Sequence, residues 1–147
     1  MRLSKKAEYG LRALVAIARQ PRRSWSIQEL AGQERIPIKF LEQILLGLRH
    51  AGILSSKRGV GGGYTLVRAA EEIRLGDVIA VFDGPLAPVP CSVEKPTEPC
   101  TCPDPRICPV RLTMTQVRKQ IASVLGDRTI EDMVRLAPGP APMAFDI

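Results

Sequence analysis

Prolines divide this sequence into segments of different kinds, because most of them are gathered in one stretch. Residues 84–109 contain 8 of the 13 prolines in the 147-residue chain. A proline has no backbone N–H to donate, so it disrupts a helix interior or a central strand. This stretch is therefore predicted to be a loop, with regular structure before and after it. A loop of this length in a compact protein usually has a function of its own.

All four cysteines lie in this loop, at Cys91, Cys100, Cys102 and Cys108. Thiols that only fill a core would be scattered along the sequence, whereas these fall within 18 positions. Permanent disulfides are rare in a reducing cytosol, so the cysteines indicate a metal site or a redox sensor. Thiolates are ligands of both iron–sulfur clusters and zinc, and the lack of a C-x2-C pair argues against zinc.

Two helices are predicted in the first part of the chain. Residues 5–20 repeat apolar side chains at helical spacing, in a stripe formed by Ala7, Leu11, Leu14 and Ala18. A second, short helix begins at Ser26 and ends near Gln33. Its start is marked by Ser26 and Glu29, which form an S-x-x-E capping box in which two side chains satisfy free backbone N–H groups.

A third helix is predicted from Pro37, because proline loses no hydrogen bond at the first helical position. Its buried face consists of Ile38, Leu41, Ile44, Leu45 and Leu48, and its opposite face carries Lys39, Gln43 and Gly47. Two helices joined by a brief turn form a helix-turn-helix, whose second helix enters the major groove of DNA. The first side chains of the third helix would then reach base edges.

The segment after the third helix predicts a hairpin with a cationic tip. Gly52 stops the helix, and the strand-like residues 53–56 and 64–67 flank the run Lys57-Arg58-Gly-Val-Gly-Gly-Gly. Such a hairpin is typical of the wing beside a DNA-reading helix, where glycines allow close approach to the duplex. The alternative is a phosphate-cradling enzyme loop, but no Gly-Lys-Ser/Thr motif and no helix follow.

Charge is distributed unevenly between the two halves of the chain. Residues 1–68 contain 13 Lys and Arg against 4 Asp and Glu, a net charge of +9, whereas residues 69–147 contain 8 against 11, a net charge of −3. A basic segment is the electrostatic footprint of nucleic-acid binding, because its cations displace the counterions condensed on phosphates. The alternative is a basic surface that only aids solubility.

Three helices are predicted outside the first three. A short apolar helix lies within residues 74–82, a long one runs from Pro109 to about Leu125, and a short one occupies 129–136. The long helix carries a heptad seam of Val110, Met114, Val117, Ile121 and Val124. A helix projecting from a small domain must bury such a seam, and a two-fold partner is favoured over packing within its own chain.

The expected location is the cytoplasm. No run approaches the roughly 18 apolar residues of a membrane span, and charges interrupt the first ten residues where a signal peptide is apolar. No enzyme activity is expected, because the single histidine has no nearby nucleophile and C-x-C differs from the C-x-x-C redox pair.

The chain resembles a known family in two sequence segments and in the cysteine loop that precedes a long helix. The segments are MRLSKKAEYGLRAL at residues 1–14 and FLEQILLGLRHAGILSSKRGVGGGY at residues 40–64. Over about residues 1–136 the chain resembles the Rrf2 family of bacterial winged-helix regulators, typified by IscR and NsrR. The resemblance implies a homodimer that binds palindromic operators in double-stranded DNA, with an iron–sulfur cluster controlling DNA affinity.

The expected fold is mainly α with a small β wing: a winged helix-turn-helix plus a long C-terminal dimerisation helix. We expect a DNA-binding domain at 1–83, a cysteine-rich cluster-binding loop at 84–108, a dimerisation helix and closing helix at 109–136, and a flexible tail at 137–147. Carried over by position, the DNA-contacting residues are Lys39, Phe40, Glu42, Gln43 and Arg58, and the hairpin tip adds Lys57.

The resemblance also implies ligands for a [2Fe–2S] or [4Fe–4S] cluster. Cys91 lies at the expected start of the loop, and Cys102 and Cys108 have a family-like interval, although Cys100 is an alternative to Cys102. One branch of the family uses a histidine three residues after the last cysteine, and this position is Arg111 here. Another branch uses an acidic residue in the first helix of the partner subunit. Glu8 stands at that place, either as a ligand or as a solvated carboxylate.

The sequence therefore predicts a dimeric DNA-binding transcriptional regulator, specifically a repressor. A cluster in the loop would sense nitric oxide, redox state or iron–sulfur status. Two alternatives stay open: a metal-free thiol redox regulator, and a cluster-carrying electron-transfer protein. The basic first half of the chain argues against the second alternative.

Overall fold

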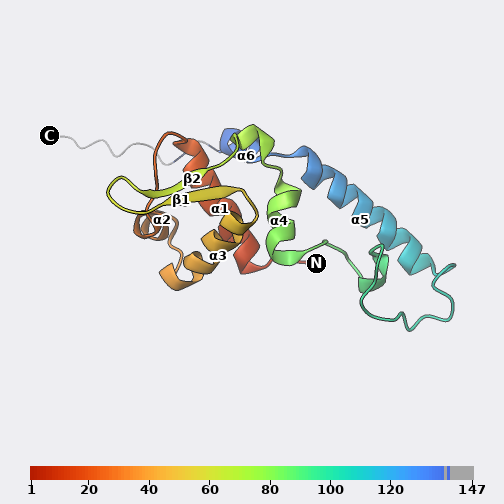
Figure 1. The fold of residues 1–147 in the computed structure, drawn as a ribbon. Helices are drawn as coiled ribbons and strands as arrows, with labels where there is room; N and C mark the ends of the chain where they lie inside the picture. Colours follow the sequence, from red (N-terminus) through yellow and green to blue (C-terminus); the bar gives the residue numbers. More distant parts are fainter. Residues whose placement is uncertain (138, 140–147) are drawn as a thin grey trace.

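Six α-helices and one β-hairpin make up the regular structure of residues 1–137 and 139, the part of the chain that this computed structural model describes (Figure 1). The helices are α1 (Lys5–Arg19), α2 (Ile27–Glu34), α3 (Ile38–His50), α4 (Leu75–Asp83), α5 (Pro109–Asp127) and α6 (Ile130–Leu136). Two 3₁₀ turns, η1 (Ala70–Glu72) and η2 (Pro90–Ser92), complete them. The expected class, mainly α with a small β wing, is confirmed.

Helix α1 lies at the centre of the core, in contact with α2, α3, α4 and α6. Ser4 caps its start, because the hydroxyl accepts the Ala7 backbone N–H at 3.1 Å. The core around it contains fully buried side chains from several helices, including Leu14, Ile17, Leu41, Leu45 and Ile130. Burial of each such side chain contributes about 1.5–3 kcal/mol, so this apolar core holds the helix-turn-helix together.

The helix-turn-helix forms as expected, with one correction. The Ser26–Glu29 capping box is present, and α2 ends at Glu34, where Arg35 takes a left-handed conformation (φ 53°). Pro37 was expected to be the first helical residue of α3, but it is the N-cap, with ψ 131°. The proline ring fixes φ and leaves ψ free, so the chain can still turn at this residue. The Pro37 carbonyl accepts the first helical hydrogen bond, from the Leu41 N–H at 2.9 Å.

The hairpin is antiparallel and each strand is shifted by one residue from its expected place. Strand β1 (Leu54–Lys57) pairs with β2 (Gly63–Leu66), with Leu54 opposite Leu66. Trp25 adds a single bridge to Tyr64 on the other side of β2. Gly63 has φ 141°, and a Cβ atom there would lie 2.5 Å from the Trp25 carbonyl oxygen. Only glycine fits where these two backbones meet.

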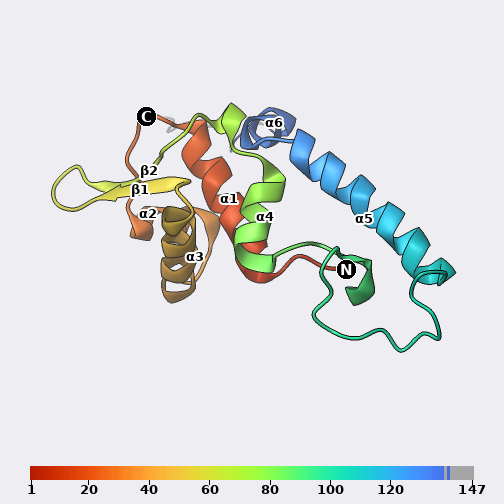
Figure 2. The same cartoon turned by 45° about the vertical axis from the view of Figure 1, so that its right-hand side comes forward.

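Helix α5 extends away from the core, and only its C-terminal end is fixed to it (Figure 2). The Leu75 N–H donates to the Arg128 carbonyl at 2.9 Å, and the Ile130 N–H donates to the Ile73 carbonyl at 2.9 Å. The Arg74 guanidinium donates to the Gly126 carbonyl at 2.6 Å. The end of α5 beside α4 is therefore anchored, and its N-terminal end carries the cysteine loop.

The predicted heptad seam of α5 divides into two kinds of position. Val110, Val117 and Val124 are 58%, 38% and 57% exposed, whereas Met114 and Ile121 are half-buried. The valines repeat every seven residues along one face of the helix. Packing within the chain therefore covers part of the seam and leaves a row of valines uncovered.

The tail expected at 137–147 lies outside the described residues, except for positions 137 and 139. Within the described part of the chain, no helix is both long and apolar enough to cross a bilayer.

Candidate functional site

The outer face of α3 presents polar side chains in the order expected of a recognition helix. Lys39, Glu42 and Gln43 are exposed, and Leu46 is 47% exposed one turn further on. The opposite face fixes the helix, because Leu41, Ile44, Leu45 and Leu48 are fully buried. A helix held this way can present its first two turns to a major groove.

Three residues of α3 differ from their expected places: Ile38, expected on the buried face, is 44% exposed, and two expected to be available to DNA, Phe40 and Gly47, are packed against other helices. Phe40 is half-buried, and its ring meets the Tyr9 ring of α1 edge-on, with centroids 5.7 Å apart. Gly47 faces α4 instead of solvent, and a Cβ atom on it would lie 3.2 Å from the Phe82 ring. Helical spacing assigns residues to faces, but it does not say which neighbouring helix covers the boundary between them.

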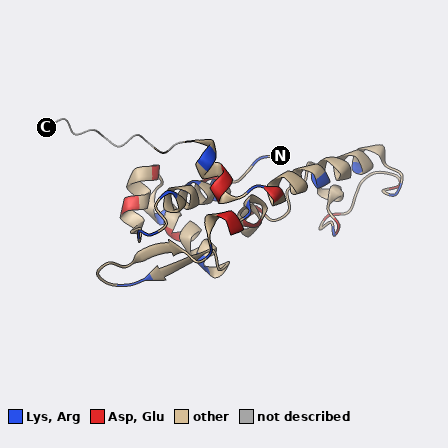
Figure 3. Ribbon diagram, turned by 90° about the horizontal axis from the view of Figure 1, so that it is seen from above, with Lys and Arg blue, Asp and Glu red and all other residues tan. Residues whose placement is uncertain are grey.

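The hairpin tip is cationic and exposed. Lys57 and Arg58 are exposed, and no acidic residue occurs between Glu42 and Glu71. Figure 3 shows the hairpin free of acidic residues, with basic positions at its tip. The hairpin is joined to α3, because the Arg49 guanidinium donates to the Ser56 hydroxyl at 3.3 Å. The wing and the recognition helix are therefore held as one unit beside each other.

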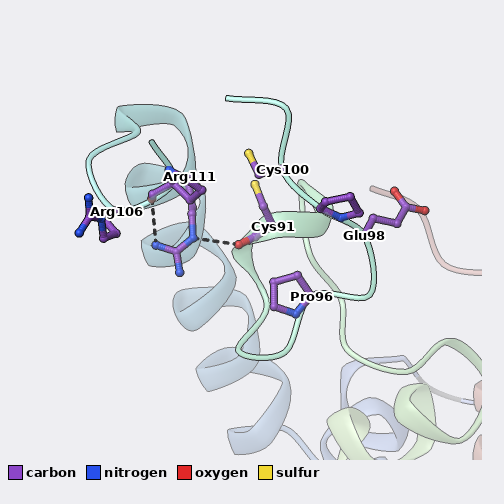
Figure 4. A pocket seen from close by; sticks show the side chains of 8 residues that line it. Cys91, Pro96, Glu98, Cys100, Arg106 and Arg111 are labelled. Carbon is purple, nitrogen blue, oxygen red and sulfur yellow. Dashed lines mark hydrogen bonds between the residues drawn. The ribbon is translucent and has the colours of Figure 1, made fainter. Parts of the chain in front are cut away.

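The four cysteines come together at the N-terminal end of α5. Cys91 lies in η2, Cys100 and Cys102 lie in the following loop, and Cys108 is the N-cap of α5. The Sγ atoms of Cys100 and Cys102 are 2.8 Å apart. The Cys91 and Cys100 side chains point toward each other (Figure 4). All four side chains are half-buried.

The contact between Cys100 and Cys102 shifts the pKa values of these two thiols in opposite directions. Hydrogen bonds from the Cys102 side chain and backbone hold the pKa of Cys100 below its usual value, and the Arg111 charge acts in the same direction. The hydrogen bond to Cys100, together with burial, raises the pKa of Cys102 to about 12. Of these two thiols, Cys100 is therefore the one that loses its proton more readily.

Two arginines of α5 hold the loop against the helix. Arg111 donates to the Cys91 carbonyl at 3.2 Å and to the Pro105 carbonyl at 3.3 Å (Figure 4). Arg118 donates to the Ser92 carbonyl at 2.7 Å. A cavity of about 350 Å³ opens beside Cys91 and Cys100 and is lined by Arg111. In the sequence, Arg111 stands where one branch of the family has a histidine ligand, and its hydrogen bonds to the loop carbonyls could not be predicted from that position.

Glu8, the acidic candidate ligand, lies on α1. Its carboxylate pairs with the Lys5 ammonium at 3.0 Å, and its side chain is 44% exposed. An exposed pair of this kind contributes little to stability, so it would yield to a stronger ligand. The structure thus leaves the carboxylate accessible to another subunit.

The donor atoms of the loop suit an iron–sulfur cluster. In the described residues, no three His, Cys, Asp or Glu side chains surround a point that could hold a single metal ion. A cluster differs from a single ion because its thiolate ligands are distributed over several iron atoms. Four half-buried thiols in one loop, two of them in direct contact, are the ligand type that a cluster uses, whereas a tetrahedral zinc site would need its ligands around one centre.

Comparisons with known proteins agree with the observed fold. Residues 3–136 match the Rrf2 family, described as iron-dependent transcriptional regulator. An rrf2-like HTH-type transcriptional regulator of Rhodobacter capsulatus is 35% identical, over 98% of this chain and 99% of its own length. Among solved structures, CymR, described as the global cysteine regulator of B. subtilis, is similar with a TM-score of 0.77 and 29% identity, covering 93% of this chain and 98% of CymR. IscR from T. potens has a TM-score of 0.73 and 28% identity, covering 92% of this chain and 87% of IscR.

Proposed function

Because the chain belongs to the Rrf2 family of DNA-binding transcriptional regulators, we propose that it is a repressor whose operator affinity is controlled by an iron–sulfur cluster in the cysteine loop. The cluster would sense nitric oxide, redox state or iron–sulfur status. The observation that carries this proposal is the gathering of all four cysteines where the loop joins α5.

The proposed ligands are Cys91, Cys108 and one of Cys100 and Cys102, with Glu8 of the partner subunit as a further candidate. When bound, a cluster of this kind supplies a redox-active centre held by thiolates. The residues of this chain orient the thiolates: Arg111 and Arg118 fix η2 on α5, and the α5 backbone begins directly after Cys108. Glu8→Gln tests the partner ligand, since the loss of bound iron would support this role and unchanged iron would restrict the ligands to cysteines.

DNA recognition in this proposal uses α3 and the hairpin of two subunits. Two copies of α3 lie in successive major grooves, about 34–36 Å apart, and each wing contacts the adjacent backbone. The exposed valines of α5 pack against those of the partner, since an uncovered heptad row is the surface that pairs helices. The cysteine loop adjoins this row, so its state can alter the spacing of the two recognition helices.

Val117→Glu is expected to convert the dimer to a monomer. An unpaired carboxylate in the middle of the valine row opposes pairing by about 3 kcal/mol or more, which is over a hundredfold in dimer dissociation constant. Sedimentation equilibrium measures this constant directly. Gln116→Glu, an exposed position one residue away, adds the same charge off the seam and is expected to remain dimeric. A Val117→Glu variant that stays dimeric would contradict this interface.

The proposed function is tested by anaerobic purification followed by iron, sulfide and absorption measurements. DNA binding is then measured with a palindromic duplex that the parent protein has selected from a random-sequence pool. The affinity for this duplex is compared between protein reconstituted with iron and sulfide and protein stripped of iron. Allosteric couplings of 1–3 kcal/mol predict an affinity ratio of about 5–150 between these two states. Equal affinities in the two states would overturn control by a cluster.

The contact between Cys100 and Cys102 supports one alternative, a thiol regulator without metal. Oxidation of such a pair would change the loop without any bound group. This alternative predicts a colourless protein from anaerobic purification, with DNA affinity that responds to thiol oxidants. An electron-transfer protein would instead show turnover with an electron donor and no binding to the selected duplex.

A further inference from the structure

The last turn of α4 inserts an aromatic ring between two other helices. A Cβ atom on Gly10 of α1 would lie 2.8 Å from the Phe82 ring, and one on Gly47 of α3 would lie 3.2 Å from it. Both glycines are inside helices, where glycine is disfavoured relative to alanine. The ring therefore occupies space that a side chain at either position would fill.

Phe82 also lies beside the point where the cysteine loop begins. Helix α4 ends at Asp83, and the chain then turns at Gly84, which has φ 65°. The Asp83 carboxylate is tied to the start of α1, because it accepts the Ser4 backbone N–H at 2.9 Å and the Ser4 hydroxyl. In both ribbon views α4 lies between the recognition helix and α5 (Figures 1 and 2). A displacement of the loop therefore reaches α4 before it reaches α3.

We propose that Phe82 is a positioning residue that transmits the state of the cysteine loop to the recognition helix α3. This inference rests on the proposed function, in which that loop controls DNA affinity. Gly47 is one helical turn after Gln43, and Leu46 beside it is 47% exposed on the outer face. The Phe82 ring lies close to where a Gly47 side chain would be, so its movement would shift the helix, because glycine offers no side chain that could absorb the motion.

A purely structural role for Phe82 makes a different prediction. If the ring only fills space, replacing it lowers stability and weakens DNA binding equally in the two states of the loop. If it transmits the state of the loop, replacing it brings the two affinities together. The ratio of the two affinities therefore separates the roles, whereas either affinity alone does not.

The test compares Phe82→Leu with Val78→Ala. Val78 is fully buried one turn earlier on the same helix, so its truncation destabilises α4 without removing the ring. Fluorescence anisotropy measures binding of the selected palindromic duplex to each variant, first reconstituted with iron and sulfide and then stripped with a chelator. We expect the ratio of about 5–150 in the parent to fall to about 2 or less in Phe82→Leu and to persist in Val78→Ala.

A second readout needs no DNA. Hydrogen exchange at the amides of residues 38–50 is measured in the free protein before and after iron removal. We expect these amides to change their exchange in the parent and in Val78→Ala, and to be unresponsive in Phe82→Leu. Gly47→Ala tests the same contact from α3 if Phe82→Leu does not fold, because its added Cβ displaces the ring. It too is expected to change the affinity ratio.

The outcomes distinguish this inference from the proposed function. If the iron-loaded and stripped parent proteins bind the duplex with equal affinity, both the proposed function and this inference are wrong. A parent ratio that persists unchanged in Phe82→Leu and Gly47→Ala, with an unchanged exchange response of α3, would overturn the inference alone. Phe82 would then be a packing residue, and another contact would connect the loop to α3.

Discussion

Cys108→Ala is expected to yield a protein that binds no iron or sulfide under anaerobic conditions. Cys108 is the N-cap of α5, a position that neither Cys100 nor Cys102 occupies, and no cysteine lies outside residues 91–108. Cys91→Ala is expected to have the same effect, because η2 is fixed on α5 by Arg111 and Arg118. Iron and acid-labile sulfide per chain, together with the visible spectrum, measure the loss.

The two central cysteines are expected to behave differently. The Sγ atoms of Cys100 and Cys102 are 2.8 Å apart, so each can take the place of the other as a ligand. Either single alanine variant should keep bound iron at a reduced level, and the double variant should lose it. Thr101→Ala, an exposed change in the same loop, is the control and should load like the parent. Full loading of Cys108→Ala would contradict the proposed ligand set.

The same cysteine variants have a predictable effect on regulation. A protein that cannot load iron should show one DNA affinity under both conditions, equal to that of the stripped parent. The comparison requires that the variant still folds, and its thermal unfolding should be close to that of the stripped parent, because the loop lies outside the core of α1 and α3. An unloaded variant that still distinguishes the two conditions would favour the metal-free thiol regulator.

Local signals in the sequence predicted most of the fold. The Ser26–Glu29 capping box marks the start of α2, the glycine run after Lys57 marks the hairpin, and Pro109 marks the start of α5. Each signal acts over a few residues. A side chain caps a free backbone N–H, a glycine adopts positive φ, or a proline occupies the first turn of a helix, where it is accepted. Such interactions can be inferred without knowing the tertiary structure.

The sequence did not predict contacts between distant segments. Gly47 was expected on the DNA-facing side of its helix, but the Phe82 ring covers it. Arg111 was expected only to replace a histidine ligand found in one branch of the family, whereas its guanidinium donates hydrogen bonds to the Cys91 and Pro105 carbonyls. The seam of α5 was expected to act as one surface, yet Ile121 is half-buried and Val124 is 57% exposed. These features depend on how helices pack together, and helical periodicity alone does not specify the partner of each face.

The sequence predicted which residues form the candidate cysteine site, but it did not predict which of their sulfur atoms lie in contact. Four thiols in a proline-rich loop are enough to indicate a metal or redox site. Which sulfurs meet depends on the path of the loop, and the structure brings the Cys100 and Cys102 sulfurs to 2.8 Å from each other. The interval between Cys102 and Cys108 was expected to be family-like, but spacing alone could not show that the Cys100 and Cys102 thiols are in contact.

Replacing both Lys57 and Arg58 by alanine is expected to weaken operator binding about 100-fold or more at physiological salt. Each side chain is exposed at the hairpin tip, and a charge-assisted contact to phosphate contributes about 1.5 kcal/mol or more. Each lost phosphate contact should also reduce the slope of log affinity against log salt by about 0.9. Fluorescence anisotropy across a salt series measures the affinity and the slope together.

Substitutions in the hairpin and in α3 are expected to affect specific and non-specific DNA binding differently. Loss of Lys57 and Arg58 removes contacts that carry no base information, so selected and unrelated duplexes should weaken by similar factors. Gln43→Ala removes an exposed side chain on the outer face of α3 and should weaken the selected palindrome by about 1–3 kcal/mol while leaving non-specific binding unchanged. Lys119→Ala, on the exposed surface of α5, removes a positive charge far from the hairpin and is the control for the loss of charge alone. A salt slope that is unchanged in the Lys57 and Arg58 double variant would show that the wing does not contact phosphates, and the proposed docking of the hairpin would be wrong.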